Sequence, residues 1–100
     1  MLMIKLEVDS SRLIPLRDAV GTKSVLLDVP EGNTVNDMIL RLAEKFGSAF
    51  KKRSGKELYD RVVTRYSIFL NNRALWLPQQ LSTTLKDGDE VKILLPSGGG

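Results

Sequence analysis

Apolar and polar residues alternate along several short segments of the chain, and a period of two is typical of a strand with one buried face. The first such segment is residues 2–8. One face of it carries Leu2, Ile4, Leu6 and Val8, and the other carries Lys5 and Glu7. Residues 24–29 repeat the pattern after a loop, so the two segments are expected to pair as an antiparallel hairpin. Three further strands are predicted at 66–70, at the short segment 75–77 and at 91–95.

A helix is predicted after Thr34, because apolar residues recur there at a spacing of three or four. This stripe consists of Val35, Met38, Ile39, Leu42 and Phe46. Thr34 suits the N-cap position, and Asp37 adds a carboxylate near the positive end of the helix dipole. Gly47 is expected to adopt the left-handed conformation that ends the helix.

The segment 48–64 has the least regular pattern and is interpreted as an exposed basic turn followed by a short helical or irregular piece. Its cluster Lys51-Lys52-Arg53 would suit an acidic partner or RNA. A solvated loop is favoured, because no aromatic residue lies close among the basic ones. Further on, Phe69 and Trp76 are expected in the core rather than at an interface.

One helix with one apolar stripe can cover one face of one sheet. The element order therefore predicts a two-layer α+β domain, with a mixed sheet of about four to five strands and one main helix. Residues 1–96 are expected to form this single domain and residues 97–100 a flexible tail. In the last strand, alternation turns Val91 and Ile93 toward the core and Leu94 away from it.

The composition excludes several kinds of chemistry. The 100 residues include neither Cys nor His, which rules out a disulfide framework, a thiolate nucleophile, Ser-His-Asp triads and His- or Cys-based zinc sites. No apolar run approaches the roughly 18–20 residues that a membrane span needs. The net charge of +3 is too small and too dispersed to indicate nucleic acid. A cytoplasmic protein without a metal, membrane or nucleic-acid site is expected.

The chain ends in three glycines, which have high backbone entropy and no side chain to bury. Two interpretations fit them. They are a terminus without a role, or a thread that enters a narrow partner site where a side chain would not fit. In the second case the reactive group is the α-carboxylate of Gly100.

Three motifs resemble the MoaD/ThiS family of ubiquitin-like sulfur carriers. Leu16-Arg17-Asp18-Ala19-Val20-Gly21-Thr22 looks like the family's loop before the second strand, residues 30–37 are similar to its helix entry, and residues 85–91 to its turn into the last strand. The tail departs from the usual Pro-Pro-x-x-Gly-Gly. The count from Asp87 to the end agrees with the family, however, and makes Gly99-Gly100 the functional pair.

The resemblance implies a β-grasp fold and a carrier that binds no cofactor itself. An adenylyltransferase similar to ubiquitin-activating enzymes (MoeB-like) would use ATP and Mg²⁺ to form the acyl-adenylate of Gly100, and a sulfur donor would convert it to a thiocarboxylate. The family implies that Gly99, Gly98, Pro96 and Leu94 contact the partners. The leading hypothesis is the small subunit of molybdopterin synthase, which would insert its tail into a MoaE-like large subunit and pass sulfur to precursor Z.

Two alternatives stay open. The same activation chemistry would serve a ubiquitin-like modifier that is joined through Gly100 to lysines of target proteins. It would also serve a sulfur carrier for another pathway, such as tRNA thiolation or the synthesis of thiamine or cysteine.

Overall fold

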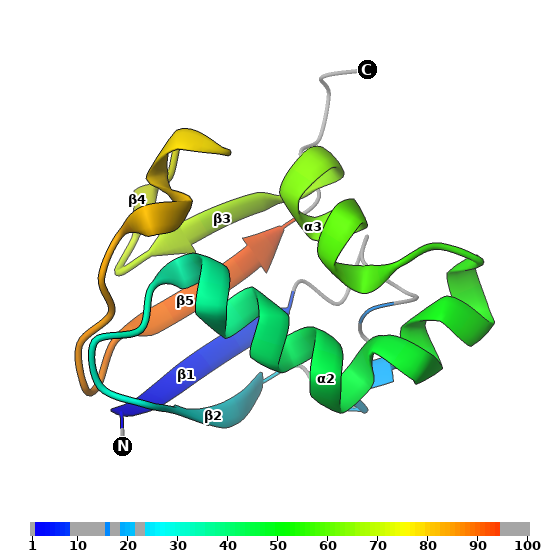
Figure 1. Ribbon diagram of the computed structural model, residues 1–100, viewed down its shortest axis with the longest axis horizontal. Helices are drawn as coiled ribbons and strands as arrows, with labels where there is room; N and C mark the ends of the chain where they lie inside the picture. The colour runs from blue at the N-terminus through cyan, green and yellow to red at the C-terminus, as the bar shows by residue number, and fades with distance from the viewer. Residues whose placement is uncertain (1, 9–15, 17–18, 22–23, 95–100) are drawn as a thin grey trace.

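The protein folds around one mixed five-stranded sheet, as a computed structural model that describes residues 2–8, 16, 19–21 and 24–94 shows (Figure 1). The strand order is β2-β1-β5-β3-β4. The bounds are Leu2–Val8 for β1, Ser24–Val29 for β2, Ser67–Leu70 for β3, Arg73–Ala74 for β4 and Glu90–Leu94 for β5. The central strands β1 and β5 are parallel, and all other neighbours are antiparallel. The predicted hairpin of the first two strands is confirmed.

Two helices lie against the same face of this sheet (Figure 1). They are α2, Val35–Ser54, and α3, Leu58–Arg65, and a short 3-10 helix, η1, spans Gln79–Ser82 between β4 and β5. The other face of the described sheet carries no helix (Figure 1). The predicted α+β architecture of the β-grasp type is therefore confirmed, with a second helix added to the main one.

The core lies between the sheet and the two helices. Alternate residues of β1 and β5 point into it, which is why Ile4, Leu6, Val91 and Ile93 are fully buried. The predicted stripe of α2 packs against them. Thr34 forms a capping box with Asp37, in which the hydroxyl of Thr34 accepts from the N–H of Asp37 and a carboxylate oxygen of Asp37 accepts from the N–H of Thr34.

The prediction that Gly47 ends the helix is wrong, because α2 continues for seven residues beyond it to Ser54. The apolar stripe explains the difference. Phe46 is half-buried, and Phe50, one turn later, is fully buried, so ending the helix at Gly47 would remove an aromatic side chain from the core. That contribution outweighs the roughly 1 kcal/mol that a glycine costs inside a helix. The left-handed residue is Gly55, with φ +73°, whose N–H donates to the carbonyl of Lys51.

The interpretation of Lys51-Lys52-Arg53 as a loop is also wrong, since the three residues form the last turn of α2. Cations are favoured there, because the carbonyl end of a helix carries a partial negative charge. The piece after it, for which a short helix or an irregular structure was expected, is helix α3, which buries Leu58 and Val62. The hydroxyl of Tyr59 donates to the side chain of Asn36 and so joins α3 to α2.

The short return strand lies earlier than predicted. It is β4, Arg73–Ala74, and residues 75–77 follow it outside the sheet. Asn71 and Asn72, both with positive φ, make the turn between β3 and β4. Trp76 is not in the core, since 78% of its surface is exposed. The predicted core position is therefore wrong for Trp76, while Phe69 is half-buried.

The motif at residues 85–91 is a structural turn that ties three strands together. Its buried carboxylate, that of Asp89, accepts hydrogen bonds from the N–H of Lys86 at 2.8 Å and from the side-chain amide of Asn71 at 3.0 Å. The carboxylate of Asp87 accepts from the N–H of Met3 at 2.8 Å, and the N–H of Gly88 donates back to the carbonyl of Met3. The turn thus fixes where β5 begins relative to β1 and the β3–β4 hairpin.

Candidate functional site

The site predicted from the sequence surrounds the end of β5, the last strand. Leu94 is its final residue, and it points away from the core because Ile93 beside it is fully buried. The predicted orientation of Leu94 is confirmed, and its side chain is half-buried. It lies opposite Ser67 of β3, so the end of β5 is paired with the start of that strand.

A second apolar residue shares this outer face of the sheet. Phe69 pairs with Lys92 of β5 on one side and with Ala74 of β4 on the other. Residues that pair directly across strands point to the same face, so Phe69 and Lys92 lie on the side that carries Leu94. Lys92 in turn pairs with Glu7 of β1, and there the apolar part of the face gives way to charged residues.

Trp76 extends this surface beyond β4. The N–H of Leu75 donates to the carbonyl of Ile68 at 2.9 Å, which continues the β3–β4 register one residue past the strand. Trp76 is the next residue after this hydrogen bond, and 78% of its surface is exposed. We call Leu94, Phe69 and Trp76 the apolar patch. Trp76 is exposed, and Leu94 and Phe69 are half-buried. Accessible aromatic and aliphatic surface of this kind is typical of protein docking sites.

Sequence reasoning found only one member of the patch. Alternation identified Leu94, but Phe69 and Trp76 were assigned to the core because large aromatic residues are usually buried. Alternation could have placed Phe69 on the outer face of the sheet, because it stands between Ile68 and Leu70 and Ile68 is fully buried. The other predicted site residues, Pro96, Gly98, Gly99 and Gly100, lie outside the described residues.

A charged pair links the last turn of α2 to the residue before α3. The ammonium of Lys51 donates to the carboxylate of Glu57 at 2.7 Å, and this hydrogen bond together with the charge of Glu57 raises the pKa of Lys51. Between α3 and β3, partial burial raises the pKa of the Tyr66 phenol.

Two kinds of feature are absent from the described residues. These residues contain no group of three Asp, Glu, His or Cys side chains that could hold a metal ion. No helix in the same residues is long and apolar enough to cross a bilayer.

Comparison with known proteins agrees with this picture. Residues 15–100 match the sequence profile of the ThiS family. Among proteins with curated functions, no sequence matches the chain.

Several solved structures share the fold. Small archaeal modifier protein 1 from Methanosarcina acetivorans is 28% identical, with a TM-score of 0.67 over 100% of this chain and 98% of that one. SAMP1 from Haloferax volcanii is 24% identical, with a TM-score of 0.67 over 98% and 99% of the two chains. A chain from the complex of subunits 1 and 2 of the molybdopterin-converting factor of Helicobacter pylori is 21% identical, with a TM-score of 0.59 over 99% and 100%.

Proposed function

The chain belongs to the ThiS family of ubiquitin-like sulfur carriers and modifiers, and from that premise we propose that it carries sulfur as a thiocarboxylate on Gly100. The observation that carries the proposal is that the family match extends through residue 100 and so includes the glycine tail. The apolar patch supports it, because a partner that takes up the tail must also hold the domain from which the tail leaves.

The proposed chemistry takes place at the backbone terminus in two steps. The carboxylate oxygen of Gly100 attacks the α-phosphorus of ATP, pyrophosphate leaves, and the acyl-adenylate forms on a MoeB-like adenylyltransferase that holds the Mg²⁺. The terminal sulfur of a persulfide then attacks the acyl carbon, and AMP leaves. A second thiol of the donor system cleaves the resulting acyl disulfide, which releases the thiocarboxylate and leaves a disulfide on the donor.

The proposed chemistry needs no reactive side chain from this chain. The chain contains no Cys to carry sulfur and no His to act as a general base, so the sulfur is held by the main chain and the acid–base groups are the partner's. The terminal residues bear no side chains, so a narrow channel can admit them.

As the specific pathway, we propose the small subunit of molybdopterin synthase, which inserts its tail into a MoaE-like large subunit. The molybdopterin-converting factor of Helicobacter pylori, whose subunits form a complex, supports this choice through its similar fold. A second candidate is a protein modifier joined through Gly100 to target lysines. It is favoured by the 28% identity to a small archaeal modifier protein over the full chain.

Intact-mass measurement tests the proposal. The full chain is incubated with ATP, Mg²⁺, the adenylyltransferase of its own host and a sulfide source, and fragmentation locates any change. We expect one oxygen to be replaced by sulfur at Gly100, and no change in a matched chain that lacks Gly100. A shortened chain that still becomes thiocarboxylated would refute the proposal. Isopeptide-linked adducts in host cells, with an unmodified free pool, would favour the modifier role.

A further inference from the structure

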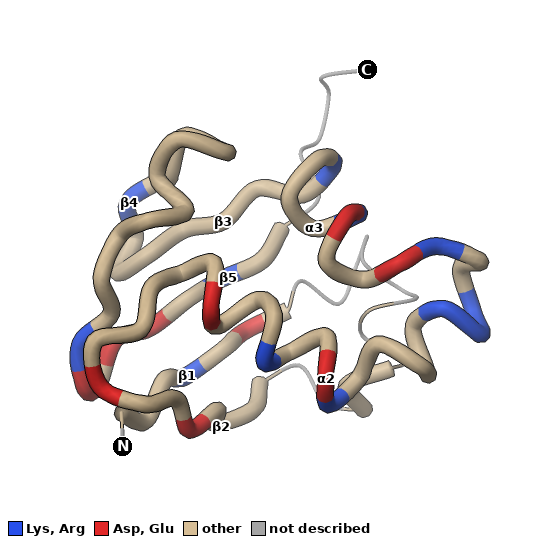
Figure 2. The backbone as a smooth tube through the Cα atoms, in the orientation of Figure 1, with Lys and Arg blue, Asp and Glu red and all other residues tan. Residues whose placement is uncertain are grey.

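The positive charge of this protein is concentrated in one segment. Residues 51–65 contain six Lys and Arg and two Asp and Glu, whereas the whole chain has a net charge of only +3. The rest of the chain is therefore slightly acidic. In Figure 2, the blue positions of this segment lie at the end of α2, in the turn after it and along α3.

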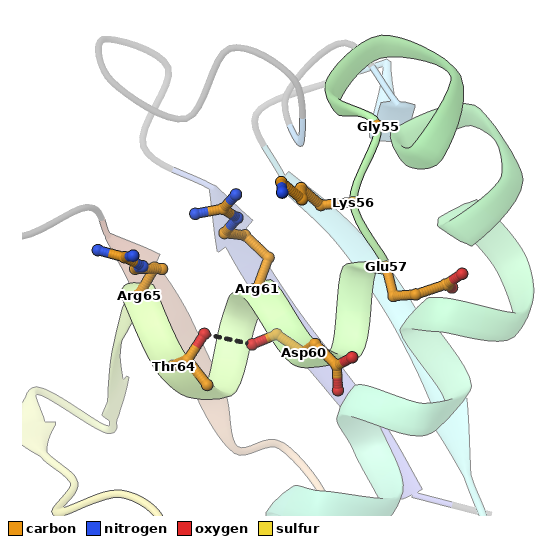
Figure 3. Close-up of a pocket in the computed structure, with 7 residues that line it drawn as sticks. All are labelled: Gly55, Lys56, Glu57, Asp60, Arg61, Thr64 and Arg65. Atoms are coloured by element: carbon orange, nitrogen blue, oxygen red, sulfur yellow. Dashed lines mark hydrogen bonds between the residues drawn. The ribbon is translucent and has the colours of Figure 1, made fainter.

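Within this segment, the turn and α3 enclose a shallow hollow of about 410 Å³. Lys56 comes from the turn, and Arg61 and Arg65 come from α3, one helical turn apart. Figure 3 shows that these three side chains point to the same side of α3. We call Lys56, Arg61 and Arg65 the basic hollow.

The carboxylates that line the same hollow do not neutralise these cations. Glu57 is bound to Lys51 of α2 at 2.7 Å, and Figure 3 shows that Glu57 and Asp60 point away from the two arginines. Among the residues that the structure describes, no ion pair joins Lys56, Arg61 or Arg65 to a carboxylate. The three cations are thus available to an external anionic group.

One end of the basic hollow lies near the end of β5. Arg65 is the last residue of α3, and two residues later Ser67 pairs with Leu94, the last residue of β5. The hollow and the apolar patch therefore lie on the two sides of the same strand ends. An enzyme that grips the tail at Leu94 has the basic hollow immediately beside its contact surface.

We infer that the basic hollow docks an acidic protein surface of the adenylyltransferase that activates the tail. The inference rests on the proposed function and adds to it a partner contact that the apolar patch does not supply. Exposed charge pairs of this kind contribute more to the association rate and to partner choice than to the lifetime of a complex. The basic hollow then steers the enzyme toward the tail, and the apolar patch holds it there.

A protein partner fits the hollow better than nucleic acid does. Single-stranded nucleic acids stack their bases on exposed aromatic rings, and the one aromatic residue of the basic segment, Tyr59, is half-buried and bound to Asn36.

The experiment measures association rates between the full chain and the adenylyltransferase of its own host at salt concentrations from low to high. The test variant is Arg61→Glu/Arg65→Glu. The matched control is Lys45→Glu/Lys86→Glu, which makes the same charge change at exposed positions outside the basic segment. Arg61→Gln/Arg65→Gln removes the charges without placing carboxylates near the end of a helix. Thermal unfolding establishes that each variant is folded.

We expect the association rate of the test variant to fall by roughly tenfold at low salt and to approach that of the wild type at about 0.5 M salt. The association rate of the glutamine variant should fall by less at low salt and should also approach that of the wild type at high salt. The association rate of the control should change by less than about twofold.

The other outcomes are distinct. If the wild type is adenylated and the test variant associates as fast as the control, the basic hollow has no docking role and the proposed function stands. If the wild type neither binds the enzyme nor forms the acyl-adenylate, the proposed function fails and the inference fails with it. If the test variant loses binding to purified host transfer RNA but associates normally with the enzyme, the hollow is an RNA surface and the inference is wrong.

Discussion

Leu94→Asp is the most direct perturbation of the proposed docking surface. Leu94 ends β5 on the outer face of the sheet, half-buried, while the core position beside it is filled by Ile93. Because the substitution leaves Ile93 in place, the fold loses only the buried half of one side chain. Full burial of a leucine contributes about 1.5–3 kcal/mol, so we expect the free energy of unfolding to fall by about 1 kcal/mol. A domain of this size survives that loss.

The effect on binding should be larger than the effect on folding. In a complex that covers the apolar patch, the remaining exposed half of Leu94 becomes buried, which contributes about 1 kcal/mol. An aspartate there loses this contribution, and burying its carboxylate without a partner costs a further ~1–3 kcal/mol. The sum of about 2–4 kcal/mol corresponds to a dissociation constant raised roughly 30- to 1000-fold.

Calorimetric titration of the adenylyltransferase with each chain measures this change, and denaturant unfolding of the same samples separates it from loss of fold. Leu26→Asp is the matched control, because Leu26 is 59% exposed on β2, an edge strand separated from β5 by β1. We expect the control to bind as the wild type does. A Leu94→Asp chain that is folded and binds with unchanged affinity would refute the assignment of Leu94 to the docking surface.

Three further predictions concern the fold. Gly55→Ala should lower the free energy of unfolding by about 1–2 kcal/mol, because the φ of +73° is unfavourable for alanine although nothing lies within 4 Å of the added methyl group. Gly47→Ala lies inside the helix and should raise the free energy of unfolding by about 0.5–1 kcal/mol. Asp89→Ala should lower the free energy of unfolding in urea by about 2–4 kcal/mol, because two donors lose their acceptor. Asp87→Ala, at an exposed position with one hydrogen bond, should lower it by about 1 kcal/mol. Burial raises the pKa of Tyr66, so above about pH 10 the unfolded chain holds fewer protons at this group than the folded one. The unfolding free energy of the wild type should then fall with rising pH more steeply than that of Tyr66→Phe, and equal slopes would contradict the pKa shift.

Short-range patterns were sufficient to predict most of the sheet and the start of the main helix. The alternation in residues 2–8 and 24–29 identified β1 and β2, because an edge or central strand with one covered face must alternate. Thr34 and Asp37 identified the helix start, because the first backbone N–H groups need acceptors wherever a helix begins. Both signals depend on the local chain alone.

The errors arose where tertiary packing decides. Gly47 has the chemistry of a helix end, but the burial of Phe50 carries the helix past it. For the end of the segment 48–64 the pattern allows a short helix or an irregular piece, and the structure has the helix, with Leu58 and Val62 buried one turn apart. The alternation of Trp76 with Leu75 and Leu77, which are half-buried, could have placed it outside the core. Its exposure follows from the end of β4 two residues earlier, and strand ends depend on pairing partners far away in the chain.

The apolar patch and the basic hollow differ in how freely their residues can change without loss of the fold. The apolar patch stands on β3 and β5 and beside β4, so its geometry is set by the strand pairing that the sheet itself requires. The basic hollow stands on the turn after α2 and on α3, whose exposed side chains take no part in the core. Substitutions there leave the fold intact, because surface changes away from caps and buried contacts have small effects on stability. We therefore expect affinity for an enzyme that binds the tail to depend on the constrained apolar patch. We expect discrimination among such enzymes to depend on the exposed basic side chains of the segment 51–65, whereas its buried residues Leu58 and Val62 are fixed by the core.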